Sequence, residues 1–169
     1  LINKKKLIQS LTSLLYIEHF TVIDKILDHF IEKISINNKK ELLHSEYPKP
    51  ITWQEIEKLS KNSIISFQSH SVTHTALRSL NDSEIEDEMV RSKNILEEHT
   101  GKKVNSFSYP YGSEKSIGKR APKIASKHYN SAVTLIRGRL RKNNPFYLPR
   151  IDLYQDDFLS LVRLKVILS

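Results

Sequence analysis

The 169-residue chain contains no cysteine, only four glycines, and a single methionine and tryptophan. The absence of cysteine excludes a disulfide scaffold, a thiolate metal site and a cysteine nucleophile. No apolar run reaches the roughly 18 residues needed to cross a bilayer, so no transmembrane segment is expected. Hydrophobic residues make up 38% of the chain, and its length is sufficient for a core without metal or disulfide cross-links.

The positive charge is concentrated in one stretch of the chain. The formal net charge is +8, and residues 101–150 contribute 12 of the 27 basic residues but only one acidic residue. Such a stretch can bind phosphates or an acidic polymer, although charge runs are more often solvated surface. No helix-turn-helix, RNA-recognition or zinc-finger pattern accompanies it, so nucleic-acid binding is not expected.

The N-terminal sequence predicts a helical segment. Residues 1–35 have the spacing of two amphipathic helices, whereas residues 47–50 contain two prolines that exclude a helix. We therefore divide the chain into a helical segment at residues 1–49, an insertion or lead-in, and a domain at residues 50–169. Because the chain begins with Leu1 rather than methionine, we expect a fragment or processed product.

From Thr52 onward, predicted helices and strands alternate. Thr52 with Glu55, and Asn81 with Glu84, have the spacing of capping boxes that start helices, and Gly101 is a candidate C-cap. Expected helices cover about residues 52–59, 81–100, 117–128 and 156–168, and expected strands cover residues 64–67, 104–109, 131–136 and 147–153. This alternation predicts an α/β fold with a parallel sheet, which places ligand sites at the carboxyl ends of strands.

Two histidines four residues apart follow the first expected strand. His70 and His74 belong to the segment Ser-His-Ser-Val-Thr-His at residues 69–74. A four-residue step in a helical turn aims both imidazoles the same way, so both can reach one divalent ion. Neutral imidazole suits zinc, cobalt or nickel, and a carboxylate normally completes the set. A pair of hydrogen-bonded loop histidines is the alternative, and the residues alone do not decide between the two.

A second motif, Ser-Phe-Ser-Tyr-Pro-Tyr-Gly at residues 106–112, also lies at the end of an expected strand. Pro110 fixes one backbone angle and Gly112 permits a sharp turn, so the aromatic side chains around them are held at a set angle. A backbone N–H at such a turn can face a developing oxyanion. A strand-end turn with packed aromatic rings is the alternative interpretation.

Together these segments resemble the polysaccharide deacetylase domain, also called the NodB homology domain or carbohydrate esterase family 4. The resemblance spans roughly residues 50–155, and its matching segments are 52–56, 70–74, Leu77, Leu80, 106–112 and 148–151. It implies a partial, distorted (β/α) barrel of the NodB type, preceded by the helical segment. The form Phe-x-Tyr-Pro-Tyr-Gly is most similar to the branch acting on poly-N-acetylglucosamine-type exopolysaccharides.

The resemblance implies metal-dependent removal of acetyl groups from an N-acetylated, glucosamine-type polysaccharide. His70 and His74 would bind one divalent cation, in this family usually Zn²⁺, which polarises the acetyl carbonyl. Tyr111 would help hold the oxyanion through its backbone, and Arg150 would position the catalytic carboxylate. Because acetylated glucan polymers lie outside the cytoplasm, the resemblance also implies an extracytoplasmic location.

One family motif has no counterpart in this chain. Thr-Phe-Asp-Asp-Gly supplies the general base and the carboxylate ligand of the family, and nothing in residues 1–69 matches it. The simplest interpretation is that the chain begins after that strand and, taken alone, lacks the base. Two functions therefore stay open: a metal-dependent polysaccharide deacetylase, whole or as a piece, and a non-catalytic carbohydrate- or anion-binding remnant of the same fold.

Overall fold

The computed structural model describes residues 22, 25–26, 29, 50–138 and 144–151. The elements in chain order are α4 (Trp53–Ser60), the 3₁₀ turn η1 (Leu77–Ser79), α5 (Asp82–Thr100), β1 (Ser106–Ser108), α6 (Glu114–Ile117), α7 (Ala121–His128) and β2 (Ser131–Val133). The four described residues before residue 50 are helical. The rest of the predicted helical segment, its boundary at residue 49 and the helix expected at 156–168 lie outside the described residues.

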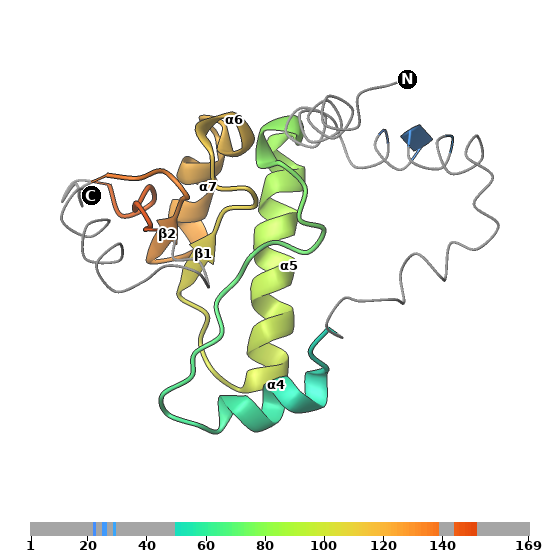
Figure 1. Ribbon diagram of the computed structural model, residues 1–169, viewed down its shortest axis with the longest axis vertical. Helices are drawn as coiled ribbons and strands as arrows, with labels where there is room; N and C mark the ends of the chain where they lie inside the picture. Colours follow the sequence, from blue (N-terminus) through green and yellow to red (C-terminus); the bar gives the residue numbers. More distant parts are fainter. Residues whose placement is uncertain (1–21, 23–24, 27–28, 30–49, 139–143, 152–169) are drawn as a thin grey trace, which may run out of the picture.

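Within the described residues, the sheet is small and parallel. β1 pairs with β2, with Phe107 opposite Ala132, and the two strands lie side by side in Figure 1. Single parallel bridges extend the sheet on both sides, joining Ser69 to Phe107 and Val133 to Leu148. Because the four segments run in the same direction, their carboxyl ends meet at one edge.

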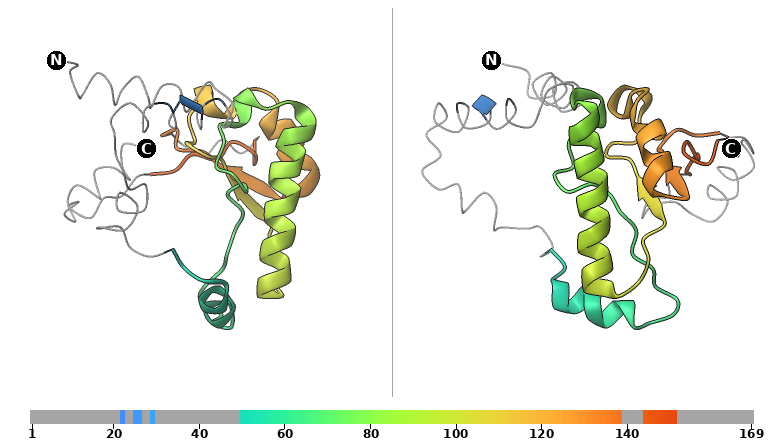
Figure 2. Two further views of the ribbon diagram at one scale, coloured as in Figure 1. Left: turned by 90° about the vertical axis from the view of Figure 1, so that its right-hand side faces the viewer. Right: turned by 180° about the vertical axis from the view of Figure 1, so that it is seen from behind.

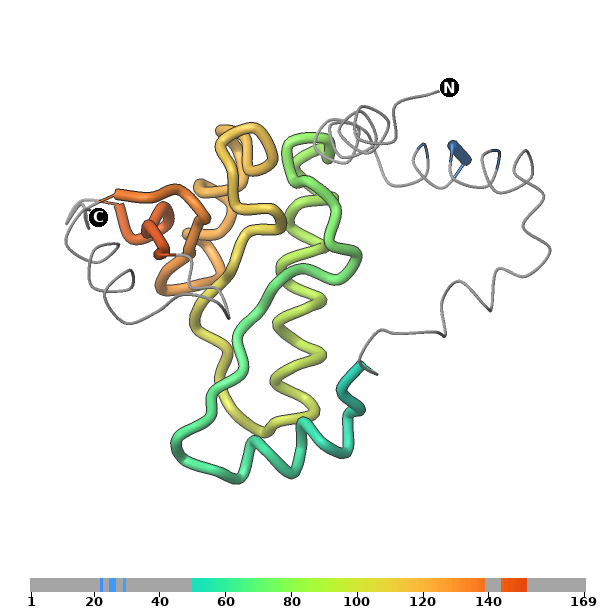
Figure 3. Tube along the Cα trace, viewed as in Figure 1, coloured from blue at the N-terminus to red at the C-terminus, as the bar shows by residue number. Residues whose placement is uncertain are grey.

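The helix α5 forms one wall of this unit. It packs against α7 along its side and against α4 at its end, as two further views show (Figure 2). The extended chain between α4 and η1 runs alongside α5 in the opposite direction (Figure 3). None of the helices that the structure describes combines the length and hydropathy of a membrane span.

The boundaries of α5 follow the sequence prediction. Asn81 Oδ1 accepts the backbone N–H of Glu84 at 3.0 Å, and the Glu84 carboxylate accepts the N–H of Asn81 at 2.7 Å. Gly101 ends the helix in the left-handed conformation, with φ +63°. The buried residues of the helix are Ile85, Glu88, Met89 and Ser92. The buried face of the helix therefore carries a glutamate among its apolar side chains.

The hydrophobic core lies between α5, α7 and the sheet. Phe107 has no exposed surface, and its ring centroid lies 5.4 Å from that of Tyr109 and 5.3 Å from that of Tyr129. Burial raises the pKa of both tyrosine hydroxyls. Each hydroxyl donates to a backbone carbonyl, Tyr109 to Phe146 at 2.9 Å and Tyr129 to Met89 at 2.7 Å. No buried side-chain nitrogen or oxygen in the described part of the chain lacks a partner.

The strand expected at residues 64–67 is not formed. Asn62 Oδ1 accepts the backbone N–H of Ile64 at 2.9 Å and makes a turn there, so the Ile64 side chain is 90% exposed. The chain pairs with β1 only at Ser69. An asparagine side chain that hydrogen-bonds its own neighbouring backbone competes with strand pairing. The position that pairs with β1 is therefore Ser69, next to His70, rather than residues 64–67.

The single helix expected at residues 117–128 is divided into α6 and α7. Gly118 adopts φ +70°, and a Cβ at this position would lie 3.2 Å from the Cβ of Arg78. Pro122 lies in the first turn of α7, where its missing N–H breaks no helical hydrogen bond. Both strands, β1 and β2, lie within the expected strands but are shorter.

Replacing Phe107 with alanine should lower the free energy of unfolding by about 3–5 kcal/mol, because the truncation leaves a cavity at the centre of the core. Urea unfolding followed by circular dichroism measures the change. Ile64→Ala is the matched control and should change stability by less than about 0.5 kcal/mol, since that side chain faces solvent. Equal losses in the two variants would contradict this placement of Phe107.

Candidate functional site

Two loops leave neighbouring positions at the carboxyl edge of the sheet. The histidine loop (residues 70–74) follows Ser69, which is bridged to β1. The tyrosine turn (residues 109–112) follows β1 directly. Because the two segments are parallel neighbours, the loops meet at the position where parallel α/β folds bind ligands.

The side chains of the two loops form one cluster. The ring centroids of His70 and His74 are 4.9 Å apart at an interplanar angle of 74°. The ring of Tyr111 lies edge-to-face against His74, with a centroid distance of 4.6 Å. Three of the residues singled out in the sequence therefore come together in the structure.

His70 is oriented by the end of β1. Its Nδ1 lies 2.6 Å from the carbonyl oxygen of Ser108, and since a carbonyl can only accept, Nδ1 carries the hydrogen. In the neutral ring, Nε2 then keeps its lone pair. A backbone carbonyl commonly fixes the second nitrogen of a metal-binding histidine in this way.

The surroundings of His74 favour the neutral form of its ring. Burial lowers the pKa of its imidazole, and the neighbouring His70 lowers it further. Its backbone N–H donates to Ser71 Oγ at 3.0 Å. Because a protonated imidazole cannot bind a cation, these influences favour the ligand form of the ring at neutral pH.

Backbone strain is concentrated at the site. Among the described residues, the non-glycine residues with positive φ are Ser71 at +68°, His74 at +58° and Tyr111 at +59°. The left-handed conformation of such residues costs on the order of 1–3 kcal/mol each, and persists where the surroundings over-determine it. All three belong to the two site loops, as is typical of positions that orient functional groups.

Glu88 of α5, which sequence reasoning did not single out, anchors the histidine loop. Its side chain is 7% exposed, and its carboxylate accepts hydrogen bonds from Val72 and Thr73. One signal in the sequence could have identified it: Glu88 lies three residues after Ile85 and four before Ser92, on the buried face of the helix. A glutamate on such a face requires polar partners.

The tyrosine turn depends on a close approach between two backbones. Gly112 has φ +60°, and its carbonyl accepts the N–H of Leu135 at 2.9 Å. A Cβ at this glycine would lie 2.5 Å from the Leu135 nitrogen. Glycine is therefore required here both by the backbone conformation and by the space available.

Arg150 lies at the same edge, on the segment beyond β2. Its Nε donates to the carbonyl oxygen of Thr134 at 2.8 Å. In the order of the sheet, two segments separate it from the histidine loop. Arg150 is thus the one predicted site residue outside the cluster of His70, His74 and Tyr111.

The two imidazoles are an incomplete set of metal ligands. The donor chemistry suits a first-row divalent cation such as Zn²⁺, and the Nε2 lone pair of His70 is available for it. In the described ranges, however, no group of three or more histidine, aspartate or glutamate side chains is arranged to hold a metal ion. Zinc binds most strongly to three or four protein ligands, so this pair fits part of such a site.

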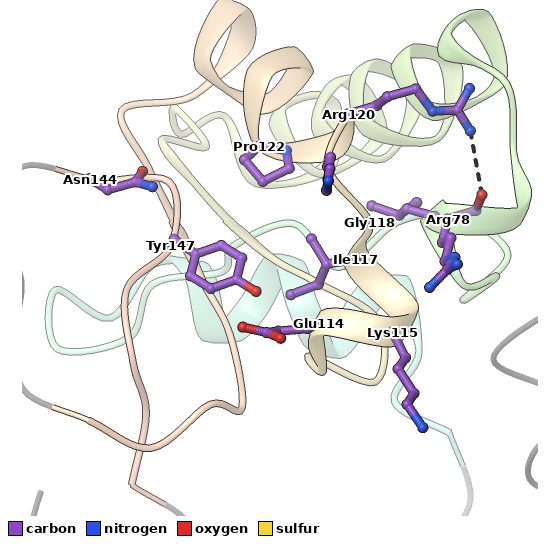
Figure 4. A pocket seen from close by; sticks show the side chains of 11 residues that line it. Arg78, Glu114, Lys115, Ile117, Gly118, Arg120, Pro122, Asn144 and Tyr147 are labelled. Atoms are coloured by element: carbon purple, nitrogen blue, oxygen red, sulfur yellow. Dashed lines mark hydrogen bonds between the residues drawn. The ribbon is translucent and has the colours of Figure 1, made fainter.

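A pocket of about 910 Å³ lies between η1, α6, α7 and the chain near Tyr147 (Figure 4). Its lining residues are Leu77, Arg78, Glu114, Lys115, Ile117, Gly118, Lys119, Arg120, Pro122, Asn144 and Tyr147. The Tyr147 hydroxyl points toward Glu114, and Ile117 lies beside them (Figure 4). Burial, and then the Glu114 carboxylate, raise the pKa of Tyr147. The pocket thus combines an aromatic ring, a carboxylate and several basic side chains.

The family model of the polysaccharide deacetylases matches residues 21–133, about two thirds of the chain. The chain therefore belongs to the polysaccharide deacetylase family, as its motifs predicted. A comparison with curated proteins gives no significant match.

Two solved deacetylase structures share the fold. Polysaccharide deacetylase BC0361 from Bacillus cereus is 22% identical with a TM-score of 0.63, and the match covers 72% of this chain and 38% of that one. The Streptococcus pyogenes deacetylase PplD, solved in complex with acetate, is 22% identical with a TM-score of 0.61, covering 68% and 50%. The chain thus spans half or less of these proteins, and the predicted partial NodB-type α/β fold is confirmed.

Gly112→Ala should destabilise the protein by about 1–3 kcal/mol more than Gly101→Ala, because only the first adds overpacking against Leu135. Both glycines have similar positive φ, and nothing lies within 4 Å of a Cβ at Gly101. Thermal and urea unfolding of the two variants provide the comparison. Equal destabilisation would show that the backbone of the tyrosine turn is not tightly packed against residue 135.

Proposed function

We propose that this chain forms the metal-binding part of a metal-dependent polysaccharide deacetylase, with His70 and His74 as ligands of one divalent cation, preferably Zn²⁺. The observation that carries the proposal is the pairing of the two imidazoles, 4.9 Å apart, at the carboxyl edge of the sheet. Because the chain belongs to the polysaccharide deacetylase family, the proposed reaction is the removal of acetyl groups from a polysaccharide.

His70 and His74 would hold the cation, His70 through Nε2 because its Nδ1 donates to Ser108. When bound, such a cation acts as a Lewis acid toward the acetyl carbonyl. Tyr111 would present its backbone N–H to the developing oxyanion, while its ring restricts the orientation of His74. Arg150, oriented by Thr134, would position the catalytic carboxylate. That carboxylate would come from outside the described residues.

The proposed substrate is an N-acetylated, glucosamine-type polysaccharide, in the branch that acts on poly-N-acetylglucosamine. The motif at residues 106–112 and the family support this assignment. A substrate of this kind also implies an extracytoplasmic location. The pocket between η1, α6 and α7, with Tyr147 and Glu114, offers an aromatic face and an acceptor for sugar hydroxyls.

A second candidate is a non-catalytic module that binds carbohydrate or an anionic polymer. The pocket favours it, since Lys115, Lys119 and Arg120 come from the basic stretch of the sequence and Arg78 joins them from η1. Basic side chains around a pocket attract polyanions through charge. This candidate needs no metal.

Zinc titration of the full chain tests the proposed ligands. Wild-type protein should bind one Zn²⁺ by isothermal titration calorimetry, and His70→Ala and His74→Ala should each weaken binding by at least about tenfold, since each removes half of the ligand pair. His99→Ala is the matched control, because His99 stacks on Trp53 and lies 3.0 Å from Glu57. Wild-type protein that binds no Zn²⁺ would overturn the metal site.

Acetate release from partly acetylated glucosamine oligomers separates the two candidates. The deacetylase proposal predicts that, in protein that includes the catalytic carboxylate, release requires Zn²⁺ and is lost in His70→Ala. The binding-module candidate predicts that the oligomers, or an anionic polymer, bind without release. It also predicts that Lys115→Ala with Lys119→Ala weakens polymer binding while Zn²⁺ affinity is unchanged.

A further inference from the structure

We propose that Glu88 is a positioning residue for the metal site. Its buried carboxylate holds the peptide between His70 and His74 in the conformation that brings the two imidazoles together. The inference rests on the proposed metal-binding function. It assigns a role to a residue of α5 that lies outside both site loops.

The contacts of Glu88 converge on the middle of the histidine loop. Oε2 accepts the backbone N–H of Val72 at 2.8 Å and that of Thr73 at 2.9 Å. Oε1 accepts the hydroxyl of Thr73 at 2.9 Å. Hydrogen bonds to a charged acceptor are roughly twice as strong as neutral ones, and three of them fix two consecutive residues. Both oxygens bond to the loop, and no group of three or more possible metal ligands is found among the described residues, so Glu88 is assigned to the loop rather than to the metal.

The clamped residues lie between the two strained positions of the loop. Ser71 and His74, both left-handed, flank Val72 and Thr73. Without the carboxylate, the N–H groups of Val72 and Thr73 would lose their partner and the loop could relax toward ordinary backbone angles. That relaxation would rotate His74 away from His70, because a change in φ moves the side chain that the residue carries.

The anchor belongs to the longest helix among the described residues. Glu88 lies in the middle of a 19-residue helix that is capped at both ends. One turn further along, the hydroxyl of Ser92 hydrogen-bonds that of Ser69, at the start of the loop. Two adjacent turns of one helix thus hold the beginning and the middle of the histidine loop. Ligands supported in this way lose less entropy when a cation binds.

The test compares Zn²⁺ affinity among three variants of the full chain. Glu88→Ala should weaken Zn²⁺ binding by about 10–100-fold, the usual effect of removing a group that orients metal ligands. Glu88→Gln should restore affinity to within about tenfold of wild type, because its amide oxygen can still accept both backbone N–H groups. Rescue by glutamine would not occur if the carboxylate merely balanced charge. Glu88→Met, which fills similar space but cannot accept the two backbone N–H groups in the same way, should bind Zn²⁺ as weakly as Glu88→Ala; affinity restored by methionine would show that the side chain only fills space.

Glu97→Ala is the matched control for lost stability. Glu97 lies on the same helix, and its carboxylate accepts the backbone N–H of Val104 at 2.9 Å. It is nine residues from Glu88, roughly 13.5 Å along the helix axis. This variant should be destabilised while keeping its Zn²⁺ affinity. Equal losses of Zn²⁺ affinity in the two alanine variants would overturn the positioning role.

Two further outcomes distinguish failure of the role of Glu88 from failure of the proposed metal-binding function. Wild-type Zn²⁺ affinity in Glu88→Ala, or a glutamine variant no better than alanine, overturns the role of Glu88 alone. Absence of Zn²⁺ binding in wild-type protein overturns the proposed function. If Glu88→Ala does not fold, Thr73→Val removes one bond of the same clamp, together with the contact of the Thr73 hydroxyl with Thr75 Oγ1 at 2.7 Å. It should weaken Zn²⁺ binding by about 3–10-fold, and unchanged affinity there also overturns the inference.

Discussion

Parallel pairing on both sides of β1 determines where every candidate functional group lies. Ser69 is bridged to Phe107 on one side, and β2 pairs on the other. Since the paired segments run in one direction, the residues that follow them leave at a common edge. His70, Tyr111 and Arg150 are far apart in the sequence, yet they share this edge because the core beneath Phe107 holds the strands in register.

The strained loops are stable only because the elements beneath them are not strained. A buried core and a long capped helix hold the two site loops, and the loops contain the positive φ angles of Ser71, His74 and Tyr111. Stabilising interactions elsewhere therefore offset an unfavourable backbone at the site, a distribution common to binding and catalytic centres. The hydrogen bond from His70 to Ser108 connects the two parts directly.

Local signals predicted the parts of the fold that local interactions control. The cap at Asn81 and the end of α5 at Gly101 each depend on neighbours within a few residues, so the sequence identified them correctly. The strand expected at 64–67 was wrong because the turn at Asn62 intervenes. Glu88 was missed because its partners, Val72 and Thr73, lie 16 and 15 residues away in the sequence. Spacing patterns within one helix do not predict contacts at that separation.

Under the proposed function, metal binding and catalysis make different demands on the site. Two imidazoles held before a cation arrives can bind it with little further ordering, whereas hydrolysis also needs a base, which the described residues do not place beside the histidines. An additional carboxylate reaching this edge would then add affinity and a base without rearranging the histidine loop. The geometry that the described residues supply is therefore that of the candidate ligands and of the candidate oxyanion turn.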